Sequence, residues 1–523
     1  MAISHHRIGC TPKQPVPPST RETCYDLAAA IDSHVDYVLA VAGAPTTHLA
    51  ETVRALRPDR FEWAVNEKVA AETAVGLSAT GRITCLVIKH NGLGLALDPL
   101  VNAAVHTIAA GIIIVSGDDP DAISSTVVQD SRMLGRAACA PTFEPALDGD
   151  TGLLMDIAVT VSELARIPTL IKVTTRIHAA CPTDARRQAG SLRHRANRAT
   201  PRIDLDTAHR LTKLGRHQRY RLVAAPVAQA ALDCPAIATS DCTKPCGPAV
   251  IAVGATADVV PVSSDYCRLV VRAGPPAPAT VVRFADRHAR TIVVEEPLPL
   301  LEEWLRTRIE RRDQLLGRLS GHLPPEGSVT SHDIARVVGD PQRGTWRTIA
   351  RKSPRIAEPG RWKDLFTAIS RLRREGVFVA TDVGSSVQLC YPPHEGADVA
   401  LCLGSPIAVA GGAARTGRTA IAVIGDYSLL HSGLESLFAA VEHKLPMTVV
   451  ILANGMQAKT GGQPLPGADI PKLIEACGVD VVERWSLADV DAAATHRRLV
   501  GLLARGSLTV LHVSESDSDR SGR

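Results

Sequence analysis

The sequence predicts an α/β protein in which parallel sheets are covered by helices on both faces and which is divided into three domains. Short apolar runs of strand length alternate with helical stretches along most of the chain, which is the pattern of βα units. A length of 523 residues exceeds what one hydrophobic core normally supports. Aromatic residues make up only 3% of the chain, so Ala, Val, Leu and Ile must fill the interiors, as is typical of covered parallel sheets.

The first predicted domain spans residues 22–185. Its strands are the apolar runs YVLAVAG, ITCLVIKH, GIIIVSG and PTLIKVTT, with helical or loop stretches between them. An arginine-rich segment, 186–202, follows the last strand. We interpret it as a solvated linker, with nucleic-acid binding as the less favoured alternative.

The second and third predicted domains span residues 203–318 and 361–516. The second contains strands around VIAVGA, LVVRAG and TIVVEE and a closing helix over 299–319, PLLEEWLRTRIERRDQLLGRL. A connector rich in Pro and Gly near 319–360 leads to the third domain, and the last residues are expected to be disordered.

Composition narrows the class of protein further. A net charge of +4 is mild for this length, so no nucleic-acid partner is expected. No apolar run approaches the ~20 residues of a membrane span, and the first residues lack the apolar core of a signal peptide. Scattered cysteines fit a reducing compartment. We therefore expect a cytoplasmic enzyme without membrane contact.

The segment 422–464 predicts a site for a metal-bound diphosphate. An apolar strand leads to the turn Gly425-Asp426, a helix is expected to begin near Gly433, and a second apolar strand returns to Asn454. The polar groups therefore follow strand ends, where parallel sheets bind ligands. Asp426, the Asn454 amide and the Met456 carbonyl supply the oxygen ligands that Mg²⁺ prefers. An ordinary strand-helix-strand unit with a Gly-Asp turn is the alternative.

This segment resembles the diphosphate motif of thiamine-diphosphate enzymes, which begins Gly-Asp-Gly and ends Asn-Asn. Tyr427 replaces the third Gly and Ala453 the first Asn, whereas the two side chains that hold metal are present. The resemblance implies thiamine diphosphate and Mg²⁺ as cofactors. The cofactor-binding residues it implies, besides Glu67 and Ile407 below, are Gly404, Ser405, Gly425, Asp426, Tyr427, Ser428, Asn454, Met456 and Gln457.

A second segment, WAVNEKVAAETAVGLSATG over 63–81, matches the pyrimidine-domain pattern of the same enzymes. Thiamine chemistry needs a carboxylic acid beside the aminopyrimidine ring, and Glu67 stands at a strand-to-helix junction, followed by small residues that permit close packing. The alternative is an ordinary first-turn acid favoured by the helix dipole.

Consecutive blocks then resemble one family, the α subunit of indolepyruvate ferredoxin oxidoreductase. The blocks are IKHNGLGLALDPL, IIIVSGDDPDAISSTVVQDSR, TIVVEEPLPLLEEWL, LCLGSPIAVAGGAARTG and TGGQPLPG. The resemblance implies a pyrimidine-binding domain, a transketolase C-terminal-like middle domain and a diphosphate-binding domain, the first and last sharing one architecture with the cofactor between them. Phosphonopyruvate and sulfopyruvate decarboxylases share weaker similarity at 91–94 and 462–464.

The cysteines depart from the pattern of that family. Its α subunit carries ferredoxin-like cysteine runs at the C-terminal end, which hold iron-sulfur clusters, and a Cys-Pro-x-Cys-Pro-His segment before the diphosphate domain. Here no cysteine follows Cys477, and GRWKDLFTAISRL stands at 360–372. We therefore expect no iron-sulfur cluster. Cys242 and Cys246 are interpreted as an incidental pair, with a redox or zinc role as the alternative.

Three further residues are candidates for the site. The family places a large aliphatic side chain, here Ile407, under the bent cofactor, although Ile407 fits a buried core position equally. His90 and His431 lie in segments that should border the thiazolium ring. A neutral histidine could relay protons there, or it could cap a helix or fill a hydrogen bond.

The sequence thus favours decarboxylation of a 2-oxo acid, with Glu67, His90 and His431 as the catalytic residues. The resemblance implies an arylpyruvate such as indolepyruvate, and we expect release as an aldehyde or ligation to a second carbonyl compound to give an acyloin. The alternative is the catalytic subunit of a 2-oxo acid ferredoxin oxidoreductase with separate electron carriers. A third hypothesis is a cofactor-binding protein that serves only in assembly, against which Glu67 argues. A homodimer or larger homo-oligomer is expected.

Overall fold

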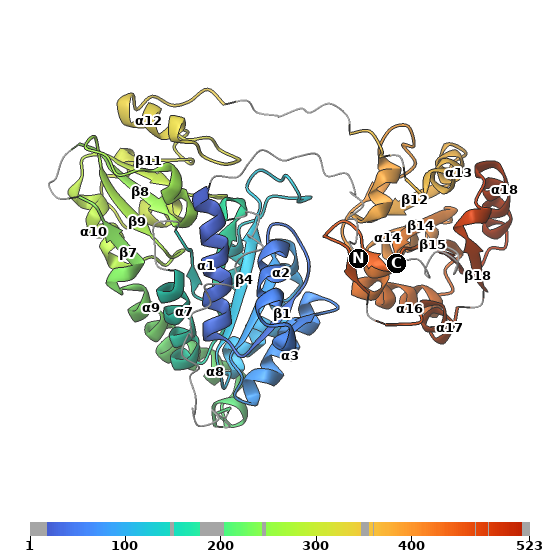
Figure 1. Cartoon of the computed structure of the whole chain (residues 1–523), viewed down its shortest axis with the longest axis horizontal. Helices are drawn as coiled ribbons and strands as arrows, with labels where there is room; N and C mark the ends of the chain where they lie inside the picture. Colours follow the sequence, from blue (N-terminus) through green and yellow to red (C-terminus); the bar gives the residue numbers. More distant parts are fainter. Residues whose placement is uncertain are drawn as a thin grey trace, which may run out of the picture. The chain divides into compact units, whose positions relative to one another are not determined.

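The computed structural model describes residues 18–146, 151–177, 203–204, 206–242, 247–346, 355–358, 360–465, 467–479 and 481–514. The chain divides into two compact units, 1–346 and 347–523, and Figure 1 labels their elements. Within the described ranges, no helix has the length and apolar character needed to cross a membrane. The predicted linker at 186–202 and the predicted disordered end past 516 lie outside these ranges.

The first sheet contains six parallel strands in the order β2-β1-β3-β4-β6-β5. Its strands are β1 Tyr37–Ala40, β2 Phe61–Trp63, β3 Thr84–Lys89, β4 Ile112–Asp118, β5 Thr142–Phe143 and β6 Thr169–Thr174. Four of them coincide with the predicted apolar runs. Helices α1 Pro18–His34, α2 Thr47–Leu56 and α7 Thr151–Ala165 cover one face, and α3 Glu67–Ala79, α4 His90–Leu95 and α5 Leu97–His106 cover the other.

Alternating side chains of the strands supply both cores of this sheet. Cys85 and Val87 of β3 pack with the first group of helices, whereas Leu86 and Ile88 pack with the second, because successive side chains of a strand point to opposite faces. A short helix, α6 Ser131–Ala137, follows β4. The prediction of a parallel sheet covered on both faces is confirmed.

The second sheet has the order β11-β10-β8-β9-β7 and lies in the same compact unit. Its strands are β7 Ala238–Ser240, β8 Ala249–Val253, β9 Cys267–Val271, β10 Thr291–Val294 and β11 Leu315–Leu316, of which β7 alone among the described strands here runs antiparallel to its neighbour. Helices α10 Ala279–Arg287 and α11 Leu300–Arg306 cover one face and α12 Ser331–Gly339 the other. Helices α8 Lys213–Arg219 and α9 Ala225–Leu232 precede the sheet.

Two expectations for this region need correction. The closing helix predicted over 299–319 ends at Arg306, because Leu315 and Leu316 are buried and pair with Thr291 and Ile292 as an edge strand. The edge strand β7 was not predicted, since its short run Ala-Thr-Ser carries little apolar pattern.

A buried ion network joins the first two sheets. Arg132, just after β4, donates to Asp130 at 2.9 and 2.6 Å and to Glu295 at 2.7 Å, and its side chain is only 1% exposed. Lys172 of β6 donates to Glu144 at 2.8 Å. Because these charges are out of water, each depends on its partners for compensation. The network therefore fixes β4 and β6 against the loop that follows β10.

The third sheet forms the second compact unit and has the order β13-β12-β14-β15-β19-β18. Its strands, all parallel, are β12 Phe378–Thr381, β13 Val399–Ala400, β14 Ala420–Gly425, β15 Met447–Ala453, β18 Val481–Ser486 and β19 Thr509–Ser514. Helices α14 Pro406–Ala414, α16 Leu434–Glu442 and α17 Ile470–Ala476 cover one face, and α13 Lys363–Arg374 and α18 Ala492–Leu503 the other. A hairpin of β16 Met456–Gln457 and β17 Gln463–Pro464 follows β15.

The first and third sheets share one strand order. Counted along each chain segment, both run second, first, third, fourth, sixth, fifth once the hairpin is set aside. The common architecture that the sequence resemblance implied is thus present in the two sheets. Each of the three sheets lies within one predicted domain range, 22–185, 203–318 or 361–516, while α12 packs on the second sheet from beyond residue 318. The exact domain boundaries stay predictions.

Candidate active site

Asp426 follows β14 directly and is buried at the carboxyl end of the third sheet. Its Oδ1 accepts a hydrogen bond from Tyr427 N at 2.8 Å, and its Oδ2 accepts one from Gly455 N at 2.7 Å. Burial raises the pKa of Asp426, and the backbone donors act against that rise. Because β14 and β15 are neighbouring parallel strands, the carboxylate reaches the loop after β15, where the other two predicted metal ligands lie.

The loop after β15 turns sharply at Gly455, whose φ of 73° lies in the left-handed region that favours glycine. Asn454 Oδ1 accepts from Met456 N at 3.1 Å. The Met456 carbonyl accepts from Ala458 N at 3.1 Å, and its cross-strand neighbour Pro464 has no N–H to donate. The Met456 oxygen thus retains the capacity to bind a cation.

The donor set fits a hard divalent cation. A carboxylate, a side-chain amide and a backbone carbonyl supply only oxygen ligands, and they come from two adjoining loops linked by the contact between Asp426 and Gly455. A cation bound there would also compensate a carboxylate whose ionised form burial disfavours. The magnesium role itself stays a prediction.

Asp382 is a second buried carboxylate at the same edge, and sequence reasoning missed it. It follows β12, and its Oδ1 accepts from Gly384 N at 3.0 Å and from the Ser386 hydroxyl. Burial raises the pKa of Asp382, and hydrogen bonds from Ser386 and Ser428 oppose the rise. The pattern that could have revealed it is the same as for Asp426: an acid with a nearby glycine immediately after an apolar strand.

The predicted diphosphate turn at Gly404 lies against the segment that contains His431. Gly404 has a φ of 82°, and a Cβ there would stand 2.2 Å from Ser432 Oγ, so the approach requires glycine. Ser405 Oγ donates to Cys402 O at 2.7 Å and closes the turn before α14. The structure therefore brings the Gly404 turn to the element that begins at Asp426.

The helix expected to begin near Gly433 is α16, which begins at Leu434 with Gly433 as its N-cap, so that prediction is confirmed. Two short elements precede it, α15 Asp426–Ser428 and the wide turn η10 Leu429–Gly433, and a kink at Ser432, where φ is −161°, separates them from α16. Gly433 is also a close-packing position, since a Cβ there would lie 2.9 Å from Ile424 Cδ1. Wide turns of this type often occur at functional sites.

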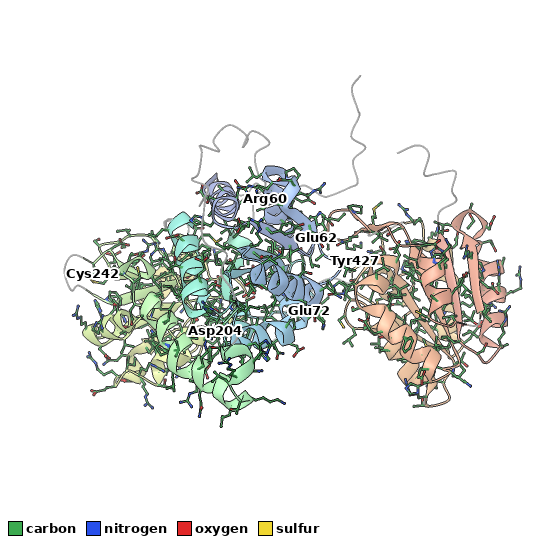
Figure 2. All side chains as sticks on the ribbon, turned by 90° about the horizontal axis from the view of Figure 1, so that it is seen from below. Arg60, Glu62, Glu72, Asp204, Cys242 and Tyr427 are labelled. Atoms are coloured by element: carbon green, nitrogen blue, oxygen red, sulfur yellow. A yellow bond between two sulfur atoms is a disulfide. The ribbon has the colours of Figure 1, made fainter. Side chains whose placement is uncertain are left out.

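His431 lies in this wide turn and is 6% exposed. The Ser432 hydroxyl donates to Leu403 O at 3.0 Å, so it accepts from His431 Nδ1 at 2.9 Å. This hydrogen bond places a hydrogen on Nδ1 of His431. The ring of Tyr427 meets that of His431 edge-on at 5.6 Å, and Figure 2 labels Tyr427 in the orange part of the ribbon.

The remaining predicted residues of this unit are Ser428, Ile407 and Gln457. Ser428 is 3% exposed and bonds to Asp382. Ile407 is fully buried in the core beneath α14, so its environment matches the core alternative, while the wedge role stays a prediction. Gln457 is buried in the hairpin, where Thr460 Oγ1 donates to its carbonyl at 3.2 Å.

Glu67 lies in the other compact unit, at the first position of α3. Asn66 caps this helix by accepting from Val69 N at 2.8 Å, and the Glu67 side chain is turned into the protein, leaving 6% of the residue exposed. A Cβ on Gly92 would stand 2.0 Å from Glu67 Oε1. The carboxyl group therefore lies directly on the Gly92 backbone, which unites two segments that the sequence singled out separately.

His90 begins α4, the helix that contains Gly92. Its Nδ1 pairs with Gly117 O at 2.9 Å, so Nδ1 carries the hydrogen. Burial lowers the pKa of His90, with the nearby Lys89 adding to the effect. Its Nε2 is buried, and a hydrogen bond between the ring and the Val127 backbone opposes the lowering of the pKa. A buried histidine whose pKa is lowered fits proton transfer, and that role stays a prediction.

Comparisons with known proteins show which sequences this chain is similar to. Residues 382–513 match the family model described as "Thiamine pyrophosphate enzyme, C-terminal TPP binding domain", a range that includes Asp382, Asp426 and Asn454. The chain is similar to indolepyruvate oxidoreductase subunit IorA of Methanothermobacter thermautotrophicus, with 27% identity over 515 residues, 87% of this chain and 80% of that protein. The subunit of Archaeoglobus fulgidus is 28% identical over 505 residues, 87% of this chain and 79% of that protein.

A solved structure is also similar in part. The 2-oxoglutarate:ferredoxin oxidoreductase of Magnetococcus marinus aligns with a TM-score of 0.44 and 12% identity, over 57% of this chain and 61% of that chain. The resemblance to thiamine-diphosphate enzymes and to the indolepyruvate oxidoreductase α subunit, inferred from the motifs, is confirmed by the sequence comparisons.

Proposed function

We propose that this chain is the thiamine-diphosphate-binding subunit of a 2-oxo acid oxidoreductase, with an arylpyruvate as the substrate and a separate carrier for the electrons. The observation that carries the proposal is the contact of 2.7 Å between Asp426 Oδ2 and Gly455 N, which puts a buried carboxylate beside Asn454 and Met456. The relatives are named as subunits of indolepyruvate oxidoreductase, which supports the oxidoreductase alternative over the non-oxidative outcome favoured from sequence alone.

The residues divide the work as follows. Asp426, Asn454 and the Met456 carbonyl bind Mg²⁺, which neutralises the diphosphate of the cofactor. Glu67, held against Gly92, exchanges a proton with the aminopyrimidine ring. When bound, thiamine diphosphate supplies the carbon that adds to the 2-oxo group and accepts the electron pair released with carbon dioxide. His90 accepts or returns a proton through Nε2.

Electron transfer then needs a partner. Oxidation of a 2-oxo acid to the level of a thioester releases two electrons, and the family passes them to cysteine-bound clusters. The sequence has no cysteine run of that kind. An iron-sulfur partner protein would therefore accept the electrons, and the subunit names of the relatives are consistent with such an assembly.

A non-oxidative decarboxylase is the second candidate, and one observation favours it. The segment 360–372, which stands where the family has a cysteine motif, folds into helix α13. Its apolar face, Leu365, Phe366, Ile369 and Leu372, is buried against the third sheet. This helix is a core element, and its sequence, KDLFTAISRLRR, contains no cysteine that could hold a cluster. The intermediate left after loss of carbon dioxide would then be protonated and released as an aldehyde. If it added to a second carbonyl compound instead, the product would be an acyloin.

One experiment separates these functions. The purified chain is incubated with thiamine diphosphate, Mg²⁺ and a panel of 2-oxo acids, and carbon dioxide is followed with and without an artificial electron acceptor. The proposal expects release that depends on the acceptor and is greatest with arylpyruvates, and Asp426→Ala is the inactive control. Turnover without acceptor, yielding aldehyde or acyloin, would establish the second candidate. No turnover in either condition, with cofactor bound, would favour a role in assembly alone.

A further inference from the structure

Cys242 and Cys267 face each other across the antiparallel strands β7 and β9. The register pairs Ser240 with Leu269, so two residues further the cysteines are direct cross-strand neighbours, with Cα atoms 4.8 Å apart and a disulfide between them. The sequence singled out Cys242 with Cys246 as an incidental pair, and that interpretation stays a prediction, whereas strand register brings Cys242 to Cys267, 25 residues away. Cys246 lies outside the described residues.

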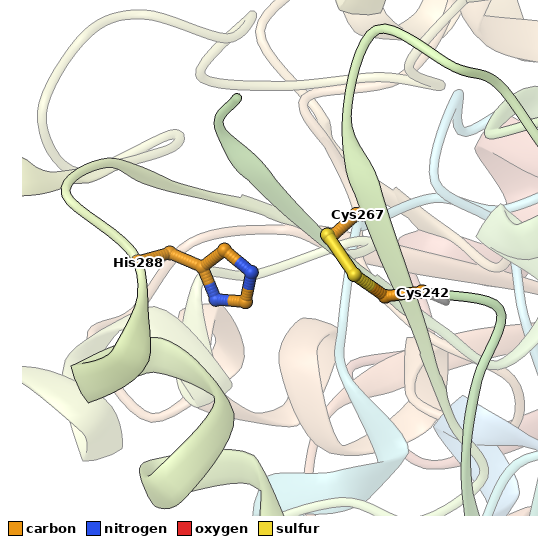
Figure 3. A group of neighbouring side chains, drawn as sticks. All are labelled: Cys242, Cys267 and His288. Carbon is orange, nitrogen blue, oxygen red and sulfur yellow. A yellow bond between two sulfur atoms is a disulfide. The ribbon is translucent and has the colours of Figure 1, made fainter. Parts of the chain in front are cut away.

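His288 completes a group of three potential ligands. The Cys242 sulfur, the Cys267 sulfur and a ring nitrogen of His288 lie within 4.8 Å of one another. Figure 3 shows the imidazole facing the two sulfur atoms, and Figure 2 labels Cys242 in the green part of the ribbon. No residue of the candidate active site belongs to this sheet.

The hydrogen bonds of His288 orient it as a metal ligand. Its Nδ1 pairs with Phe284 O at 2.8 Å, at the end of α10, so Nδ1 carries the hydrogen and Nε2 bears the lone pair. The residue is 8% exposed, and Nε2 is buried without a hydrogen-bond partner among the described residues. Histidines that bind metal commonly donate their other N–H to a backbone carbonyl in this way. Capping of α10 accounts for the hydrogen bond of Nδ1. It does not account for the buried Nε2, because a polar atom in the interior normally requires a partner to compensate its burial.

We propose that Cys242, Cys267 and His288 form a binding site for a thiophilic divalent cation, Zn²⁺, when the disulfide is reduced. Two thiolates and an imidazole are ligands that tetrahedral Zn²⁺ prefers. Tetrahedral zinc holds two sulfurs about 3.8 Å apart and a sulfur and a nitrogen about 3.5 Å apart, distances within the 4.8 Å span of the group. Water takes the fourth position. Because the same two sulfur atoms form the disulfide and would bind the metal, the disulfide and the bound metal are mutually exclusive.

Reduction of the disulfide requires a two-electron reductant from solution. A dithiol or a phosphine donates two electrons to the Cys242–Cys267 bond, which breaks to give two thiols, and the reductant becomes a disulfide or a phosphine oxide. Zn²⁺ then displaces the two thiol protons, so binding releases protons. Cys242 is half-buried and Cys267 fully buried, so the Cys242 sulfur is the one that a reductant reaches.

The test is a zinc titration of the whole chain, reduced with a phosphine that is then removed under anaerobic conditions. Zn²⁺ is measured by competition with a chromophoric chelator, and Co²⁺ is titrated in parallel because tetrahedral cobalt thiolates absorb characteristically. Reduced wild type should bind one ion per chain at this site, and the oxidised form none. Cys242→Ser and His288→Gln should each weaken binding by more than about 100-fold, beyond the loss typical of an outer-shell change.

Two further variants test whether a loss of zinc binding comes from the loss of a ligand at this site. His288→Cys retains a ligand and should retain binding, and Cys477→Ser, which alters a cysteine at the end of α17 in the other compact unit, should bind like wild type. The circular dichroism of each variant checks folding. Equal affinity of reduced wild type and His288→Gln, or equal binding by the oxidised and reduced forms, would overturn the proposal. Absence of site-specific zinc in reduced wild type would leave only a disulfide and would also overturn it.

Discussion

Gly92→Ala should slow activation of the thiazolium carbon although it leaves the three predicted metal ligands unchanged. The alanine Cβ would occupy the space of the Glu67 carboxyl group. The ideal Cβ would lie 2.0 Å from Glu67 Oε1, 2.4 Å from Cδ and 2.5 Å from Cγ, whereas real Cβ contacts below 3.0 Å essentially do not occur. The oxygen must therefore move by at least the difference, about 1 Å. A displacement of that size in a positioned group costs about 10²-fold in rate.

Gly94→Ala is the matched control. Gly94 lies two residues further in the same helix, and nothing stands within 4 Å of a Cβ there. Both variants gain helix propensity of up to about 1 kcal/mol, so the difference in their free energies of unfolding isolates the clash. We expect that difference to be about 1–3 kcal/mol, the usual cost of overpacking.

The assay follows deuterium exchange at the thiazolium carbon of bound thiamine diphosphate, by NMR after acid quench. Exchange should fall about 100-fold in Gly92→Ala and stay unchanged in Gly94→Ala. Glu67→Asp in the Gly92→Ala background shortens the side chain, so it should restore stability but not exchange. If folded Gly92→Ala exchanged as fast as Gly94→Ala, the position of Glu67 would be irrelevant to activation and the inference would fail.

Three more outcomes are expected. Asp426→Ala should abolish Mg²⁺-dependent binding of thiamine diphosphate in calorimetry, because a divalent cation loses its anionic ligand; unchanged affinity would remove Asp426 from the metal site. Arg132→Met should lower the free energy of unfolding in urea by about 3–5 kcal/mol, since it leaves buried carboxylates uncompensated, and a loss below about 1 kcal/mol would contradict the network. Burial and the neighbouring Asp130 raise the pKa of Asp118 to about 7. Because the folded state then binds more protons than the unfolded state between about pH 4 and 7, stability should fall as pH rises through that range, and Asp118→Asn should remove this part of the slope in melting curves.

Local patterns in the sequence were sufficient for the long central strands, for the parallel sheets, and for Asp426 and Asn454, which follow strand ends. Apolar runs locate β3, β4, β14 and β15 because burial on both faces requires them. Asp426 and Asn454 follow adjacent strands, and parallel pairing alone brings their loops together. The resemblance to thiamine-diphosphate enzymes could be recognised from the motifs and their order along the chain alone.

Contacts between distant segments needed the tertiary structure. The position of Glu67 on the backbone of Gly92 and the group of Cys242, Cys267 and His288 each join residues whose spacing carries no periodic pattern. The same holds for Leu315 and Leu316, whose helical spacing gives way to pairing with β10. Periodicity records which face of an element is buried, whereas strand register and side-chain packing decide which residues meet there.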